Sequence, residues 1–108
     1  MNSYIPNSAL FHVETIFKDN ISINQGSNYL INTTTHQTPV PVINNYSPIG
    51  IVGYTLSPSV GDGDGSNAAT TTVYRLRLDD SKEYILASLH ANSQCKISLY
   101  VDVLYIRN

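Results

Sequence analysis

Oxygen-bearing side chains alternate with glycine in the stretch SVGDGDGSN, which contains Asp62, Asp64 and Ser66, with Asn67 directly after. An EF-hand places its first calcium ligands at alternate positions in this way. The match then fails, because a loop that starts at Asp62 needs Gly at its sixth position and Glu at its twelfth. This chain has Asn67 and Val73 there. We therefore expect no metal ion at this loop.

The same loop, residues 57–69, is the longest segment without strand character. Its glycines permit backbone conformations that other residues resist, and loops on a rigid β scaffold often carry binding. Asp62, Asp64, Ser66 and Asn67 could hydrogen-bond the hydroxyls of a sugar, so these four are the candidate ligand-binding residues. An insertion without a role explains the loop equally well, since long surface loops cost little stability.

Three histidines could act as metal ligands or general bases, but their surroundings support neither role. His12, His36 and His90 lack metal-ligand spacing, and each has polar neighbours in or beside an expected strand. We expect all three at the surface. No Gly-x-Ser-x-Gly segment supports a Ser-His-Asp triad.

The remaining candidates for chemistry also fit structural roles. Cys95, the single cysteine, opens the apolar face of a strand, which favours a small buried side chain over a nucleophile. Asp79 and Asp80 lie in LDDSKE, which indicates a hairpin turn rather than a glycosidase acid pair, because that pair needs a cleft. The sequence thus predicts no catalytic residue, no cofactor and no enzyme.

Composition restricts the class of protein. Charged residues make up 13% of the 108 residues, against about 25% in typical domains, and 8 tyrosines occur without tryptophan. This favours a β-rich extracellular or virion protein. A net charge of −2 without a basic stripe argues against nucleic acid as a partner. No apolar run reaches the roughly 20 residues of a membrane span, and MNSYIPNSAL lacks signal-peptide features, so we expect no membrane insertion.

Stretches rich in β-branched and aromatic residues alternate with Gly, Pro, Asn and Asp along the whole chain. The expected strands are residues 10–17, 21–23, 27–35, 46–56, 70–78, 83–91 and 95–108. Residues 38–43 hold two prolines, which confines them to an edge or a crossing segment. About seven to eight short strands predict a small antiparallel, jelly-roll-like β-sandwich, as one domain over residues 1–108 that is cut from a longer chain.

Alternation within the strands predicts which side chains share a face. The core set of the last strand is Cys95, Ile97, Leu99, Val101, Val103 and Tyr105. In residues 70–78 the shared face is Tyr74, Leu76 and Leu78. In residues 10–17 one face holds Phe11, Val13 and Phe17, and the other holds His12 and Glu14.

The chain carries more apolar surface than one small sandwich can hide. Leu104 and Ile106 fall opposite the core set of the last strand, and residues 46–56 are apolar on both faces. Exposed apolar patches mark interfaces, so we expect a homo-oligomer. The alternative is that loops cover both faces of these strands. The candidate interface residues are Ile51, Tyr54, Tyr84, Leu86, Tyr100, Leu104 and Ile106.

Two segments, YSPIGIVGYTL and LASLHANSQCKISLYVDVLYIRN, together resemble the C-terminal domains of phage tail-fibre and related structural proteins of Firmicutes bacteria and their phages. Those chains carry a GY-x-P-[IL]-G-[IV]-V-G strand and close with VLY[VI]. The matching residues are Tyr46, Pro48, Ile49, Gly50, Ile51, Val52, Gly53, Val103, Leu104, Tyr105 and Ile106, while Asn45 replaces a glycine.

The resemblance implies a small β-sandwich at a fibre tip, in the virion or outside the cell. It implies a homotrimer that contacts a glycan or protein of the host-cell surface and has no catalytic residue. Two other functions stay open. The chain could be a carbohydrate-binding module of a secreted protein, or a purely structural virion component that binds only other virion proteins.

Overall fold

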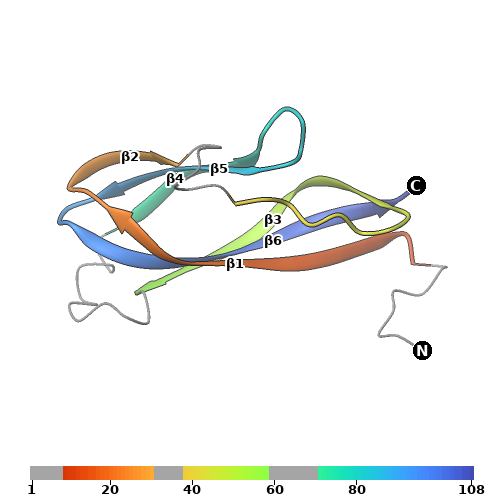
Figure 1. Ribbon diagram of the computed structural model, residues 1–108, viewed down its shortest axis with the longest axis horizontal. Coiled ribbons are helices and arrows are strands. Elements are labelled where there is room, and N and C mark those ends of the chain that lie inside the picture. Colours follow the sequence, from red (N-terminus) through yellow and green to blue (C-terminus); the bar gives the residue numbers. More distant parts are fainter. Residues whose placement is uncertain (1–8, 31–37, 59–70) are drawn as a thin grey trace.

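The computed structural model describes residues 9–30, 38–58 and 71–108, and in these ranges it contains six strands and no helix. The strands are β1 (Phe11–Ile23), β2 (Gly26–Leu30), β3 (Tyr46–Pro58), β4 (Thr72–Leu78), β5 (Ile85–Ala91) and β6 (Cys95–Arg107). They form two antiparallel sheets, which we call the long sheet (order β1-β6-β3) and the short sheet (order β2-β5-β4) (Figure 1). The predicted all-β sandwich is confirmed.

The described ranges hold fewer strands than the seven to eight expected. Residues 10–17 and 21–23 belong to one strand, because the chain between Lys18 and Ile21 forms a bulge in β1 instead of a turn. Asn20 adopts φ 60° within this bulge, a left-handed conformation that asparagine tolerates better than most residues. Of the expected strand at 27–35, only the part up to Leu30 is described, as β2.

The apolar face of β6 forms the centre of the core. Its six predicted core side chains, at alternate positions from Cys95 to Tyr105, are all at most 7% exposed, so this prediction is confirmed. They belong to one cluster with Ile85, Ala87, Leu89 and Ala91 of β5. Because β6 and β5 are the middle strands of their sheets, the core lies between the two sheet centres.

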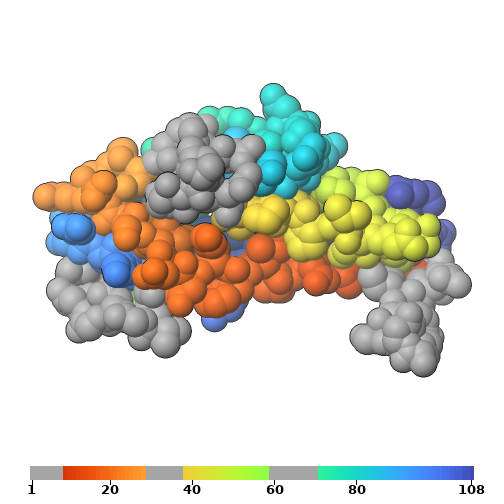
Figure 2. Space-filling view, viewed as in Figure 1, coloured from red at the N-terminus to blue at the C-terminus, as the bar shows by residue number. Residues whose placement is uncertain are grey.

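The long sheet has three strands of 13 residues, whereas the strands of the short sheet have only five to seven. The segment 38–45 covers part of the remaining inner face (Figure 1). Val40 is buried there, and the Tyr105 hydroxyl donates a hydrogen bond to the Pro41 carbonyl at 2.7 Å. In the space-filling view this segment, in yellow, lies between β1 and the hairpin that joins β4 to β5 (Figure 2).

Residues 38–43 do not form a regular strand. Their strand-like pairing is an isolated bridge between Pro39 and Tyr84, which fits prolines that cannot donate to a ladder. Two backbone hydrogen bonds flank the bridge, from the Val40 N–H to the Glu83 carbonyl and from the Ile85 N–H to the Thr38 carbonyl. The segment is therefore the crossing element that the prolines predict, fastened to the start of β5.

The predicted face of β4 is wrong at one position. A bulge between Val73 and Arg75 shifts the alternation, because it places two residues against one on β5. Val73 and Leu76 consequently pack against the core, while Tyr74 is 60% exposed. Leu78 is buried as expected.

Candidate functional site

The side of the long sheet that faces away from the short sheet carries an apolar surface, which we call the outer face. It consists of Phe11, Val13 and Phe17 of β1 and Tyr100, Leu104 and Ile106 of β6. These residues stand in register as the cross-strand pairs Phe11–Ile106, Val13–Leu104 and Phe17–Tyr100. Four of these residues are well exposed: Phe11 at 51%, Val13 at 48%, Phe17 at 50% and Tyr100 at 39%.

One carboxylate interrupts the outer face. Asp102 stands opposite Thr15, whose hydroxyl donates a hydrogen bond of 2.6 Å to Asp102 Oδ1. On the other side of β6, Gly53 of β3 stands opposite Asp102. A Cβ on Gly53 would lie 3.2 Å from Asp102 Oδ2. Gly53 therefore leaves room for this carboxylate, which is half-buried and already has a donor.

The predicted interface residues lie on several surfaces rather than on one. Tyr100, Leu104 and Ile106 belong to the outer face. Leu86 is a half-buried residue of β5 between the buried Ile85 and Ala87, so it lies on the opposite side of the short sheet from the core. The remaining three lie elsewhere: Ile51 packs against the core, Tyr54 is exposed on β3, and the half-buried Tyr84 bridges to Pro39.

Sequence reasoning missed the contribution of β1 to the outer face. The prediction that Phe11, Val13 and Phe17 share one face is consistent with their alternate positions opposite β6. This face is the half-exposed one, however, and the sequence analysis gave it no interface role. The alternation of three large apolar side chains with His12 and Glu14 could have indicated this surface. Only one of the two faces of the strand can reach the core, so the other must lie on the outside of the sheet.

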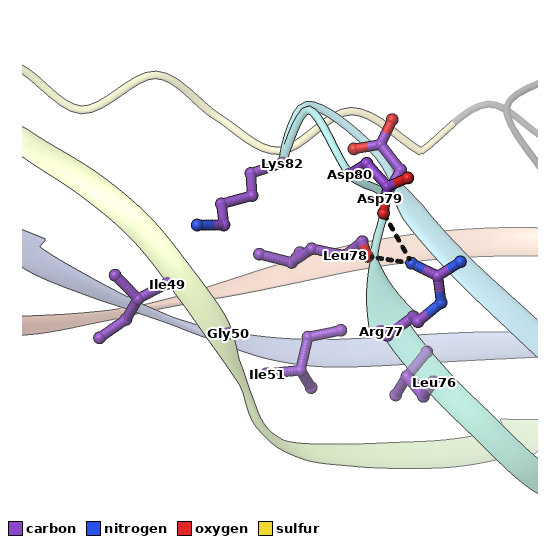
Figure 3. Close-up of a pocket in the computed structure, with 9 residues that line it drawn as sticks. All are labelled: Ile49, Gly50, Ile51, Leu76, Arg77, Leu78, Asp79, Asp80 and Lys82. Atoms are coloured by element: carbon purple, nitrogen blue, oxygen red, sulfur yellow. Dashed lines mark hydrogen bonds and ion pairs between the residues drawn. The ribbon is translucent and has the colours of Figure 1, made fainter.

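A second candidate site lies between the edge strands β3 and β4. Two adjoining hollows of about 380 and 390 Å³ share Ile51 and Leu76 in their walls. The first is lined by β3 and by the turn that joins β4 to β5 (Figure 3). The second is lined by Tyr54 and Tyr74, which are 48 and 60% exposed. We call these two hollows together the edge groove.

The β4–β5 turn is ordered by Asp79. Its carboxylate accepts hydrogen bonds from the Glu83 N–H at 2.9 Å, the Tyr84 N–H at 3.2 Å and the Ser81 hydroxyl at 2.9 Å. Desolvation alone would raise the pKa of Asp79, but hydrogen bonds from the Tyr84 N–H, Ser81, and the Glu83 and Lys82 N–H groups outweigh it and lower the pKa. The structure is consistent with the hairpin turn expected for Asp79 and Asp80.

Lys82 occupies a strained position in this turn. Its φ of 60° is the left-handed conformation, which costs roughly 1–2 kcal/mol for an ordinary L-residue. The other two non-glycine residues with positive φ in the described ranges, Asn20 and Asn45, are asparagines, which tolerate it. Asp80 pairs with Arg77 at 3.7 Å, whereas the Lys82 side chain extends away from both aspartates toward β3 (Figure 3).

The other sequence-predicted candidates fall in different places. Asp62, Asp64, Ser66 and Asn67 lie outside the described residues, as does His36. His90 is exposed as expected. Cys95 is buried as expected, with its sulfur 3.5 Å from the Thr71 hydroxyl.

His12, expected at the surface, is half-buried. Its side chain is only 24% exposed, and Nε2 lies 2.8 Å from Glu14 Oε1. The ring stands about 6 Å from the rings of Tyr46 and Tyr105 on the inner face of the long sheet. Burial, and secondly the negative charge of Glu14, raises the pKa of Tyr105. These groups pack one end of the long sheet.

In the part of the chain that the structure describes, no three His, Cys, Asp or Glu side chains gather as a metal site would require. Within the same ranges, no helix has the length and apolar character needed to cross a membrane. Comparison with protein-family models, with curated proteins and with solved structures finds no significant match for this chain.

Proposed function

We propose that this chain is a non-enzymatic domain of the phage tail-fibre type, which assembles as a homotrimer and contacts a host-cell surface. The observation that carries the proposal is the outer face. Phe11, Val13 and Phe17 are about half exposed and Tyr100 is 39% exposed, on a part of the β1–β6 pair that stays in register from Phe11 to Lys18. Large exposed apolar patches mark interaction surfaces.

The energetics favour covering this surface with protein. Burying a large apolar side chain fully contributes about 1.5–3 kcal/mol, so covering these four half-exposed ones contributes on the order of 4 kcal/mol per subunit. Asp102 limits how completely this surface can be covered, because desolvating a carboxylate whose side-chain donor is the Thr15 hydroxyl is costly. The interface must therefore leave Asp102 in contact with water or supply it with a further donor. Three copies that pack their outer faces around a common three-fold axis cover this surface in a closed ring, in which each interface joins different patches of neighbouring subunits.

The two sequence segments that carry the resemblance to fibre domains are neighbours in space. The matching residues of the first lie on β3 and those of the second, Val103 to Ile106, lie on β6, with Gly50 opposite Leu104 and Ile51 opposite Val103. The resemblance therefore concerns one continuous piece of the long sheet. This supports a shared structural element rather than two unrelated coincidences.

A carbohydrate-binding module is the second candidate function. Exposed Tyr54 and Tyr74 beside a groove favour it, because tyrosine rings offer flat apolar faces with a polar tip, as sugars require. A purely structural virion component needs the outer face but no sugar contact, so glycan binding separates it from both other functions.

The test measures the mass of the purified protein by light scattering coupled to size exclusion. We expect three times the 11.9 kDa chain mass for the wild type and a shift to monomer for the Phe17→Ser, Tyr100→Ser double variant. Tyr74→Ser, which changes an exposed tyrosine outside the outer face, is the matched control and keeps the wild-type mass. Binding of the wild type to host cells or purified wall polysaccharide is measured in parallel. A monomeric wild type would contradict the assembly, and absent surface binding would leave the structural role.

A further inference from the structure

We propose that the edge groove binds an anionic glycan, with Lys82 contacting its negative charge and Tyr54 and Tyr74 stacking against its sugar rings. This inference rests on the proposed contact with a host surface, and it names the place on the chain and the chemistry that the place recognises. The place differs from the 57–69 loop, in which the sequence suggested binding.

The backbone conformation of Lys82 points to a ligand. Glycine or asparagine would occupy the left-handed position with less strain, and asparagine does so at Asn20 and Asn45. Lys82 contributes its backbone N–H to the turn, through a hydrogen bond to the Asp79 carbonyl, and the Asp79 carboxylate binds the N–H groups of Glu83 and Tyr84. The lysine side chain takes no part in these hydrogen bonds. Strained residues of this kind cluster at ligand sites.

The distribution of charge along the edge groove favours an anionic ligand. Of the two carboxylates in its wall, Asp80 pairs with Arg77, while Asp79 keeps its charge and accepts hydrogen bonds from the turn. Lys82 and Arg75 outnumber this one remaining negative charge. Lys82 and Arg75 are exposed and form no ion pair with any residue among 9–30, 38–58 and 71–108. The groove therefore presents unpaired positive charge on a chain whose net charge is −2, and this charge complements an anion.

The bulged edges of β3 and β4 favour a glycan over a peptide strand. A peptide that adds to a sheet edge needs a regular row of backbone groups. β3 has bulges at Pro48–Gly50 and Ile51–Gly53, and β4 has one at Val73–Arg75, so neither edge offers such a row. A glycan needs stacking faces and hydrogen-bonding groups instead, and the exposed rings of Tyr54 and Tyr74 supply the faces.

Figure 3 shows how the parts of the first hollow combine. Lys82 reaches from the turn toward β3 on the side of Ile49, and Arg77 stands on the other side with Asp80. Ile51 and Leu76 form the wall shared with the second hollow, where Tyr54 and Tyr74 lie. An extended anionic chain could thus meet the ammonium at one end and the two rings at the other.

The experiment titrates the full chain with four probes by calorimetry: tetragalacturonate, a phosphorylated mannotetraose, neutral maltotetraose and a tetraglutamate peptide. We expect one or both anionic sugars to bind, and to bind more tightly than the neutral sugar and the peptide. Lys82→Asn should weaken that binding at least about fivefold, the loss of one charge-assisted contact, without lowering the melting temperature. Tyr54→Ala with Tyr74→Ala should weaken all sugar binding. Lys96→Gln, at an exposed lysine on β6, is the charge-matched control and keeps wild-type affinity.

Three results would overturn the inference: equal affinity of Lys82→Asn and wild type for both anionic sugars, no preference over maltotetraose, or tighter binding of tetraglutamate. The molar mass of the protein in the same samples is measured by light scattering. A monomer that still binds the anionic sugars through Lys82 would sink the proposed assembly and keep this site. A trimer that binds cells without any dependence on Lys82 would support the proposed assembly and contradict this site.

Discussion

Phe17 and Tyr100 face each other directly across β1 and β6, with ring centroids 4.6 Å apart and both rings half in water. Aromatic pairs in this arrangement attract each other beyond the area that they bury. The pair lies in the outer face and is its largest continuous aromatic surface.

A double-mutant cycle on Phe17→Ala and Tyr100→Ala should give a coupling energy of about 0.5–1.5 kcal/mol in the free energy of unfolding. The measurement is urea denaturation at a protein concentration low enough to keep the chain monomeric. At higher concentration the coupling should grow, because the same rings then also contact a second subunit. A coupling of zero at every concentration would show that the two rings do not interact.

Gly53→Ala should destabilise the domain by about 1 kcal/mol, because the added Cβ lies 3.2 Å from Asp102 Oδ2 and pushes the carboxylate from Thr15. Gly50→Ala is the matched control on the same strand, since no atom lies within 4 Å of its new Cβ, and it should change stability little. Adding Asp102→Ala should rescue Gly53→Ala in thermal unfolding. Equal effects at both glycines would refute this steric account.

Asp79→Asn should destabilise the domain by about 1 kcal/mol at neutral pH, a modest figure because solvent reaches the turn. The lowered pKa of Asp79 sets the pH dependence. The charged carboxylate is favoured in the folded chain, so its contribution is present above the usual pKa of 3.8 and is lost as the pH falls through the lowered value. The difference in the free energy of unfolding between wild type and variant, measured with urea, should disappear below pH 3.8. Asp80→Asn should change this free energy little, because Asp80 has only an exposed ion pair of 3.7 Å with Arg77.

Lys82→Gly should raise the free energy of unfolding by about 1 kcal/mol, because glycine adopts positive φ without steric strain. Asn45→Gly, at a φ of 71°, is the comparison and should change stability much less, since asparagine already tolerates the conformation. Thermal unfolding measures both. A loss of stability in Lys82→Gly would mean that the lysine side chain supports the turn.

Tyr105→Phe should cost about 1–2 kcal/mol in the free energy of unfolding, because the Pro41 carbonyl loses its 2.7 Å donor while the aromatic ring stays buried. Tyr100→Phe, whose ring is exposed on the other face of the same strand, should be close to neutral. Hydrogen exchange of the Val40 amide should also speed up in Tyr105→Phe if the bond fastens segment 38–45. Unchanged exchange would show that other contacts hold the segment.

The sequence predicted regular alternation well and bulges poorly. The core set from Cys95 to Tyr105 was correct because β6 runs without a bulge in its own backbone. Tyr74 was misassigned because nothing in TTTVYRLRL indicates that two residues oppose one on β5. The bulge at Asn20 was predicted to be a turn, because asparagine is favourable in both turns and bulges and the local sequence does not separate them.

The candidate sites were only partly predictable. Tyr100, Leu104 and Ile106 were found because alternation separates them from the core set. The edge groove joins β3 to β4 across two sheets, so no local pattern could bring Tyr54 and Tyr74 together. Lys82 could not be predicted as a binding residue from the sequence. What marks it is its positive φ, a backbone conformation that lysine normally avoids.

The central place of β6 in the long sheet has a consequence for the newly made chain. β1 and β3 both pair with β6, and in the order β1-β6-β3 they do not pair with each other. A ribosome makes both of them before their shared partner, so they leave the exit tunnel as strands with nothing to pair with. Closure of the long sheet therefore waits for the last strand of this sequence, and a stall or truncation before Cys95 would leave β1 and β3 as unpaired, aggregation-prone strands.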